Sequence, residues 1–154
     1  MIVYEFKDFG LTFNISKTEK VDQQLLNDFY SELSEVDKEL ISYYKNLNFE
    51  IETYYIIKSS EKAIGYARLV IEKFYANLLE IFISSEFREL GLGTKLLNYI
   101  IGDLKKNDYK FRAVVLPSDR TAKNFYESNS ITARMIIMEE KRENSRRRPW
   151  WYNL

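Results

Sequence analysis

Apolar and polar residues follow one another along this chain with two different spacings, and each spacing predicts one kind of element. Residues 2–7 and 11–16 mix the two classes on either side of Gly10, which predicts a hairpin or two short strands. Apolar residues then recur at helical spacing over 21–33, and a second such stripe follows Ser34. The amino-terminal third therefore predicts two strands followed by two helices.

The rest of the chain alternates between strand-like and helical patterns. Further strands are predicted at 53–58, 63–72, 78–83, 111–116 and 131–138, with turns at 59–62 and at Asn77. Helices are predicted from Gly93 to Lys106 and from Asp119 to Glu127.

The order of these elements predicts the fold class. A strand, a helix and a strand over 78–116 predict a parallel pair joined by a right-handed crossover, whereas the earlier hairpins predict antiparallel pairing. We therefore expect an α/β (α+β) fold with a mixed, mostly antiparallel central sheet and helices on both faces.

Composition narrows the chemistry. The chain has 154 residues, 45% hydrophobic and 30% charged, which fits one globular domain. It contains no cysteine and no histidine, so disulfides, thiolate nucleophiles and the usual zinc ligands are excluded, and no metal site is expected. Acid–base chemistry must then use Glu, Asp, Tyr, Lys, the chain terminus or water.

The net charge of zero is unevenly distributed, because segment 141–148 holds five basic residues and only one acid. Three interpretations of the basic and aromatic tail stay open. Trp150 and Trp151 pack on the domain or on a second copy as a homodimer, the charges are solvated, or three arginines bind nucleic acid, for which the whole-chain charge gives no argument. The amino terminus has no signal-peptide pattern and no apolar run is long enough for a membrane span, so we expect a cytoplasmic protein without a membrane partner.

The loop between the strand at 78–83 and the next helix carries the most specific motif, Arg88-x-x-Gly91-x-Gly93. A strand that turns through glycines into a helix presents unpaired N–H groups at the positive end of the helix dipole, where phosphate oxygens bind. The motif fits neither the Walker loop nor the three-glycine dinucleotide fingerprint. It therefore predicts a phosphate site of another kind.

This loop resembles the pyrophosphate loop of the GNAT family of N-acetyltransferases, which binds acetyl-coenzyme A. A second segment, Ala122-Lys123-Asn124-Phe125-Tyr126-Glu127, resembles that family's Ala-x-x-Phe/Leu-Tyr-Glu helix. The resemblance covers roughly residues 11–140 and is specific over 79–127. It implies the acyl-CoA N-acyltransferase fold with a splayed parallel strand pair, a GNAT domain over 1–143 and a separate tail over 144–154.

The resemblance also implies roles for particular residues. Tyr126 matches the tyrosine near the cofactor sulfur and is the expected acid. The family's glutamate is replaced by Asn77, so Glu80 on the same strand is the nearest candidate base; an ion pair on the sheet face and a water chain acting as base are the alternatives. The residues expected to hold acetyl-CoA are Ile81, Phe82, Ile83, Arg88, Glu89, Leu90, Gly91, Leu92, Gly93, Thr94, Asp119, Asn124 and Tyr126. Asp119 stands where the family commonly has Asn, and a helix N-cap is sufficient reason for it.

The function that follows from the resemblance is acetyl-CoA-dependent transfer of an acetyl group to a primary amine of a small molecule or protein, with acetyl-CoA as cosubstrate and no metal. The helices at 19–48 and the last predicted strand, 131–138, are expected to form the acceptor site. The acids of these helices would suit a cationic amine or simply a solvated face: Glu32, Glu35, Asp37 and Glu39. The alternative function is a non-catalytic acyl-CoA-binding or regulatory domain of the same fold.

Overall fold

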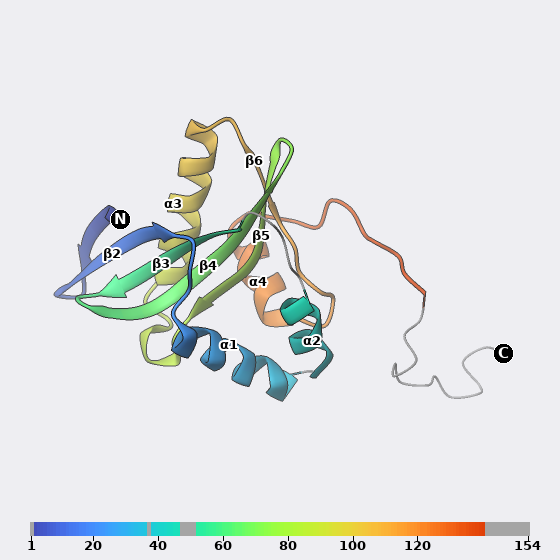
Figure 1. Cartoon of the computed structure of the whole chain (residues 1–154), viewed down its shortest axis with the longest axis horizontal. Coiled ribbons are helices and arrows are strands. Elements are labelled where there is room, and N and C mark those ends of the chain that lie inside the picture. The colour runs from blue at the N-terminus through green and yellow to red at the C-terminus, as the bar shows by residue number, and fades with distance from the viewer. Residues whose placement is uncertain (1, 37, 47–51, 141–154) are drawn as a thin grey trace.

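The computed structural model describes residues 2–36, 38–46 and 52–140, and it shows one mixed sheet with helices packed on it (Figure 1). The strands follow one another across the sheet in the order in which they occur in the sequence. The strands are β1 (Ile2–Asp8), β2 (Leu11–Thr18), β3 (Glu52–Ser59), β4 (Lys62–Glu72), β5 (Tyr75–Ile83) and β6 (Lys110–Ala113). The helices are α1 (Gln23–Val36), α2 (Lys38–Asn46), the short 3-10 helix η1 (Ser85–Phe87), α3 (Leu92–Lys106) and α4 (Arg120–Ser128).

The pairing of the strands confirms the predicted fold class. Neighbouring strands from β1 to β5 pair antiparallel, and β5 pairs with β6 in parallel after the crossover through α3. The pairing of β4 with β5 shifts register between Arg68 and Leu69, where Leu69 lies opposite Leu78 and Arg68 lies opposite Glu80. This bulge bends β5 near the point at which β5 and β6 separate.

Two hydrophobic cores lie on opposite faces of the sheet. The larger core packs α3 and Tyr126 of α4 against side chains such as Tyr55 and Ile57. The smaller core packs α1 and α2 against the other face. Adjacent residues of one strand point to opposite faces, so Ile56 belongs to the second core although its neighbours belong to the first. Helices thus cover both faces, as the sequence predicts.

Two sequence predictions are wrong in the strands. Asn77 lies inside β5 rather than in a turn; the turn is at Lys73 and Phe74, and Lys73 takes a positive φ of 56° there. The segment 131–138 forms no strand, because within the described part of the chain no neighbouring strand supplies hydrogen-bond partners.

The turn after α4 contains a left-handed residue just beyond the helix end. Asn129 ends the helix with φ −102°, and Ser130 takes the left-handed conformation with φ 63°. The predicted boundary at 143/144, Trp150, Trp151 and the basic segment lie outside the described residues. Over the residues that the structure describes, no helix has the length and apolar character needed to cross a membrane.

Candidate active site

The carboxyl-terminal half of β5 is paired on one side only. Its pairing with β4 continues to Ile83, whereas its pairing with β6 ends at Leu78. The last hydrogen bond between the diverging strands runs from the Val114 N–H to the Leu78 carbonyl, at 2.9 Å. The main-chain edge from Leu79 to Ile83 therefore has no strand partner among the described residues, which is the splayed parallel pair that the family resemblance implies.

The loop after β5 leads directly into the amino terminus of α3. Gly91 is the N-cap of that helix and has φ 74°, a left-handed conformation that glycine adopts without strain. The first helical hydrogen bond is donated by Lys95 to the Gly91 carbonyl, at 3.0 Å. Among the described residues, no acceptor binds the preceding N–H groups, those of Leu92, Gly93 and Thr94. These groups can hold phosphate oxygens.

The two glycines of the loop serve different purposes. A Cβ on Gly91 would meet no atom within 4 Å, so only the backbone conformation requires glycine there. A Cβ on Gly93 would lie 3.2 Å from the ring of Phe125, so Gly93 lets α4 pack closely on the start of α3. The spacing Gly-x-Gly thus combines a turn with a helix contact.

Arg88, the arginine of the motif, is turned toward α1. Its Nε donates to the Ile83 carbonyl at 2.9 Å, and its Nη2 forms an ion pair with Glu32. Its guanidinium lies 5.4 Å from the centre of the Phe82 ring. Arg88 therefore occupies the carbonyl at the end of the unpaired β5 edge, and both of its polar partners in the described structure, Ile83 and Glu32, belong to the protein.

The other predicted cofactor residues lie on or before α4. Asp119 is the N-cap of α4: one carboxylate oxygen accepts from the Ala122 N–H at 3.2 Å and the other from the Tyr44 hydroxyl at 3.2 Å. Asp119 therefore has the N-cap role that the sequence analysis gives as sufficient reason for an acid at this position. Asn124 is exposed on the same helix.

Tyr126 is buried, with 4% of its surface exposed. Burial, and next the negative charge of Asp119, raise the pKa of Tyr126 well above its ordinary value. No hydrogen bond of its hydroxyl within the described residues contributes to this shift. The side chain is therefore a protonated phenol at neutral pH.

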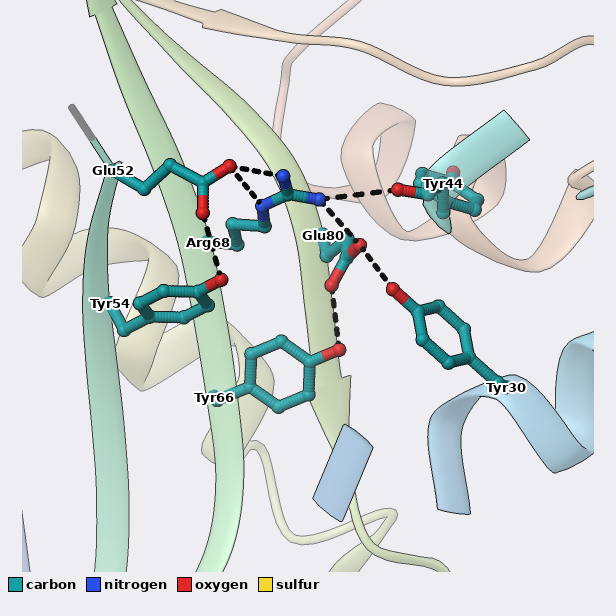
Figure 2. Close-up of polar contacts among 7 residues, drawn as sticks. All are labelled: Tyr30, Tyr44, Glu52, Tyr54, Tyr66, Arg68 and Glu80. Carbon is teal, nitrogen blue, oxygen red and sulfur yellow. Dashed lines mark hydrogen bonds and ion pairs between the residues drawn. The ribbon is translucent and has the colours of Figure 1, made fainter. Parts of the chain in front are cut away.

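Glu80 lies at the centre of a cluster of polar side chains on the opposite face of the sheet from α3 (Figure 2). Its carboxylate accepts from the Tyr66 hydroxyl at 2.7 Å, from Arg68 Nη1 at 3.2 Å and from the Tyr30 hydroxyl at 3.3 Å. Burial raises the pKa of Glu80, although these donors and the charge of Arg68 act in the opposite direction.

Arg68 connects Glu80 to the rest of this cluster. Its Nε and Nη2 donate to Glu52, and its Nη1 also donates to the Tyr44 carbonyl at 3.3 Å. Glu52 in turn accepts from the Tyr54 hydroxyl at 3.1 Å, and burial, with that carboxylate among the further causes, raises the pKa of Tyr54 to about 12. The cluster joins α1 and α2 to three strands.

A cavity of about 880 Å³ opens between this cluster and the helices α1 and α2. Its lining includes Tyr30, Tyr44, Tyr54, Arg68 and Glu80, together with amide and hydroxyl side chains of the two helices. The acids expected there behave differently. Glu32 pairs with Arg88, Glu35 is exposed, and Asp37 lies outside the described residues.

Tyr44 brings the two predicted catalytic residues into one region. Burial is the first cause of its raised pKa, and Asp119, Tyr126 and Glu80 each raise it further. Tyr44 therefore lies near Tyr126 on one side and near Glu80 on the other. Its main-chain carbonyl and its hydroxyl bind Arg68 and Asp119, respectively.

Sequence reasoning missed Arg68, Glu52 and the tyrosines that surround Glu80. One signal was present: Arg68 interrupts the apolar run 63–71. A strand with this pattern is buried, and an arginine is buried only when other groups pair with its charge. The partners come from separate elements, so no spacing in the sequence identifies them. No group of three metal-ligating side chains is found in the ranges that the structure describes.

Comparisons with known proteins agree with this geometry. The family model described as the acetyltransferase (GNAT) family matches residues 19–130. No curated protein matches the sequence.

Solved structures show the same fold at low identity. An aminoglycoside acetyltransferase from an uncultured soil metagenomic sample, in complex with trehalose, is 16% identical with a TM-score of 0.62 and covers 84% of this chain and 95% of that chain. An aminoglycoside N-acetyltransferase in complex with CoA is 12% identical with a TM-score of 0.57 and covers 90% and 99%. The ribosomal-protein-S18-alanine N-acetyltransferase from Escherichia coli is 18% identical with a TM-score of 0.51 and covers 75% and 76%. The chain therefore belongs to the acetyltransferase (GNAT) family and, as its sequence predicts, is a transferase.

Proposed function

We propose that this protein transfers the acetyl group of acetyl-CoA directly to a primary amine. One observation carries the proposal: the unpaired edge of β5 ends at a helix that begins with three N–H groups lacking a protein acceptor in the described structure. An extended, amide-containing arm can pair with such an edge, and a diphosphate can bind such a helix terminus. The CoA complex of a structural neighbour supports the same donor.

The residues of the loop hold the donor in this proposal. The N–H groups of residues 89–94 bind the diphosphate, and the space beside Gly91 is open, since a Cβ there would meet no atom within 4 Å. The backbone of Ile81, Phe82 and Ile83 supplies the edge, apart from the Ile83 carbonyl, which Arg88 already binds. Asp119 acts through the N-cap of α4, and Asn124 lies on the exposed side of that helix.

Acetyl-CoA supplies the thioester: the amine forms a C–N bond to its carbonyl carbon while the C–S bond breaks. Main-chain N–H groups of β5 polarise that carbonyl. Tyr126 gives its proton to the departing sulfur, and its raised pKa keeps that proton in place until then.

Glu80 is the proposed acceptor of the amine proton, directly or through water. It lines the cavity, and burial raises its pKa toward the range in which a carboxylate exchanges protons usefully. A carboxylate has about four acceptor positions, and the two tyrosines and Arg68 occupy three of them. One position therefore remains for the amine or for a water molecule.

The cavity beside Glu80 is the proposed acceptor site. Solved structures with a similar fold include enzymes that act on aminoglycosides and one that acts on the alanine of a ribosomal protein. Both a small molecule and a protein amine are therefore consistent acceptors. The cytoplasmic location, the domain boundary at residue 143 and a homodimer through the tail stay predictions.

Two measurements test the proposal. Calorimetric titration with CoA and acetyl-CoA measures the first step, and thiol release from acetyl-CoA on a panel of amines and peptides measures the second. We expect saturable binding of both ligands and amine-dependent thiol release. Binding without turnover on any amine would favour a non-catalytic CoA-binding domain, whereas failure to bind either ligand would overturn the proposed function.

A further inference from the structure

The face that α1 turns toward the cavity beside Glu80 is polar but carries no charge. Its amide and hydroxyl side chains follow one another at spacings of three or four residues, so they lie along one face of the helix: Gln23, Asn27, Ser31 and Ser34. A different face of α1 is apolar and packs on the sheet, with Phe29 at its centre. The cavity therefore meets the helix along a stripe of uncharged hydrogen-bonding groups.

The acids of α1 lie on another face of the helix. None of Asp28, Glu32 and Glu35 lines the cavity. Within the described part of the chain, the carboxylate that does line it is that of Glu80, which Arg68 and two tyrosines already contact. An ammonium group that leaves water without a carboxylate partner loses its solvation at a high cost. The described lining therefore suits an acceptor with one amine better than a polycation.

Lys45 brings a positive charge to the exposed side of the cavity. It lies in the last turn of α2 and is part of the cavity lining. Among the described residues it forms no ion pair. The other cation of the lining, Arg68, is held by Glu52 and Glu80. Lys45 is therefore the cation that a ligand in this cavity can neutralise.

One tyrosine side chain lies between Lys45 and the proposed base. The Nζ atom of Lys45 lies 5.3 Å from the centre of the Tyr30 ring, and the Tyr30 hydroxyl donates to Glu80 at 3.3 Å. Figure 2 shows the side chain of Tyr30 extending from α1 toward Glu80. An acceptor whose amine lies beside Glu80 can thus place a second group beside Lys45, several bonds away. An anionic group there is attracted by the cation.

The polar stripe of α1 has hydrogen-bonding capacity to spare. The Gln23 amide donates to the Asn27 carbonyl oxygen at 3.1 Å, so the Gln23 oxygen and the Asn27 amide protons have no partner among the described residues. The Ser34 hydroxyl donates to the Ser31 carbonyl at 2.6 Å, which leaves its lone pairs as acceptors. These donors and acceptors match the hydroxyl or amide groups of a ligand.

We propose that the acceptor is a primary amine that carries one anionic group together with hydroxyl or amide groups, and that Lys45 binds the anionic group. An amino-sugar phosphate and a short acidic peptide both offer this chemistry. The inference rests on the proposed function and narrows its acceptors. It disfavours aminoglycosides, on which some structural neighbours act, because an aminoglycoside carries several ammonium groups.

Calorimetry in the presence of CoA measures acceptor binding without turnover. Two matched pairs of probes differ only in the anionic group or its neutral replacement: glucosamine 6-phosphate against glucosamine, and the amide of Ala-Ala-Glu against that of Ala-Ala-Gln. We expect the anionic member of at least one pair to bind about 10-fold more tightly than its neutral partner, and the pair that shows this identifies the source of the chemistry. Spermidine, a polycation, should bind more weakly than that anionic probe.

Substitution of Lys45 tests the assignment. Lys45→Gln should abolish the preference for the anionic probe, and Lys45→Glu should reverse it. Lys38→Gln is the matched control, because Lys38 is exposed on the same helix but does not line the cavity, so the preference should persist. Circular dichroism confirms that the three variants fold.

The outcomes separate this inference from the proposed function. Equal affinity within both pairs, no affinity for any probe, or a preference that survives Lys45→Glu would overturn the inference. Thiol release from acetyl-CoA that is as fast with glucosamine or spermidine as with the anionic probes would overturn it too, while supporting acetyl transfer. Selective binding of an anionic probe without thiol release would instead keep the anion site at Lys45 and count against the proposed function.

Discussion

The loop after β5 follows the end of the strand that carries Glu80, and this loop and the cluster around Glu80 are built in opposite ways. The loop offers main-chain N–H groups. It depends on the absence of a side chain at Gly91, which takes a left-handed conformation, and at Gly93, which lies close to Phe125. The cluster consists of side chains that satisfy one another, with Arg68 held between Glu52 and Glu80. One region is open toward a ligand, and the other is internally paired.

This difference predicts how each region responds to substitution. A region whose donors lack protein partners can lose a side chain at little cost to folding, because no buried group is left without a partner. A region of buried, mutually paired charges loses stability when any member is removed. Stability measurements should therefore report on the cluster, and ligand affinity should report on the loop.

Arg68→Met should give the largest effect on stability. The side chain of Arg68 is 7% exposed and that of Glu80 is 0% exposed, so the variant leaves an uncompensated buried carboxylate. Removing one partner of such a pair costs about 3–5 kcal/mol. Chemical denaturation followed by circular dichroism measures this loss as a lower midpoint.

The pH dependence of Arg68→Met tests the cause. Without the guanidinium, burial raises the pKa of Glu80 still further above its ordinary value of 4.5. A carboxyl group whose pKa is raised on folding gives its stability below the unfolded pKa and loses it as the pH rises through the folded pKa, so the destabilisation should grow from pH 4 to pH 8. Arg68→Met combined with Glu80→Gln should recover part of the loss; an equal loss at both pH values would assign the effect to packing instead.

Tyr126→Phe should separate chemistry from binding. No hydrogen bond to the hydroxyl is found within the described residues, so its removal should leave the melting temperature and the CoA affinity unchanged. A lost general acid lowers kcat by about 100-fold, at the lower end of the usual range. Because burial and Asp119 hold the phenol protonated, kcat of the parent should not decline through Tyr126 ionisation between pH 7 and pH 9. An unchanged kcat in the variant would remove Tyr126 from the mechanism.

The same contrast explains what the sequence could and could not reveal. The loop is local: a strand, two glycines and a helix follow one another, so Arg88, Gly91 and Gly93 were found from spacing alone. The roles assigned to these residues stay predictions. The mixed pairing of the sheet followed from the order of the elements, because strands joined by short turns pair antiparallel and the strands joined through α3 pair in parallel.

The cluster around Glu80 is assembled from five elements, and no local pattern encodes which of their polar residues meet. Its ion pair with Arg68 was one of two interpretations of Glu80 and is present in the structure. The turn placed at Asn77 was wrong because strand residues continue on both sides of it, from Tyr75 onward. The strand predicted at 131–138 was wrong because strand propensity needs an edge to pair with, and the sequence does not show which edge is near.

Gly91→Val should show that the loop depends on its backbone. At φ 74° a β-branched residue costs about 1–2 kcal/mol, and no neighbour within 4 Å contributes a clash. Gly91→Asn should cost less because Asn tolerates this conformation. We expect CoA affinity, measured by calorimetry, to fall in the order Gly, Asn, Val. If both variants bind CoA as the parent does, the left-handed N-cap is not needed for the ligand.

The ion pair between Arg88 and Glu32 should have the smallest effect, because both side chains are exposed, at 43% and 42%. A double-mutant cycle with Arg88→Gln and Glu32→Gln should give a coupling of about 0.5 kcal/mol that fades at high salt. The informative readout is affinity: Glu32→Gln removes a carboxylate that competes for Arg88, so CoA should bind more tightly, whereas Arg88→Gln should weaken binding. If Glu32→Gln weakens binding instead, the ion pair positions the loop. Arg88 would then belong to the internally paired part of the molecule rather than to the region that is open toward a ligand.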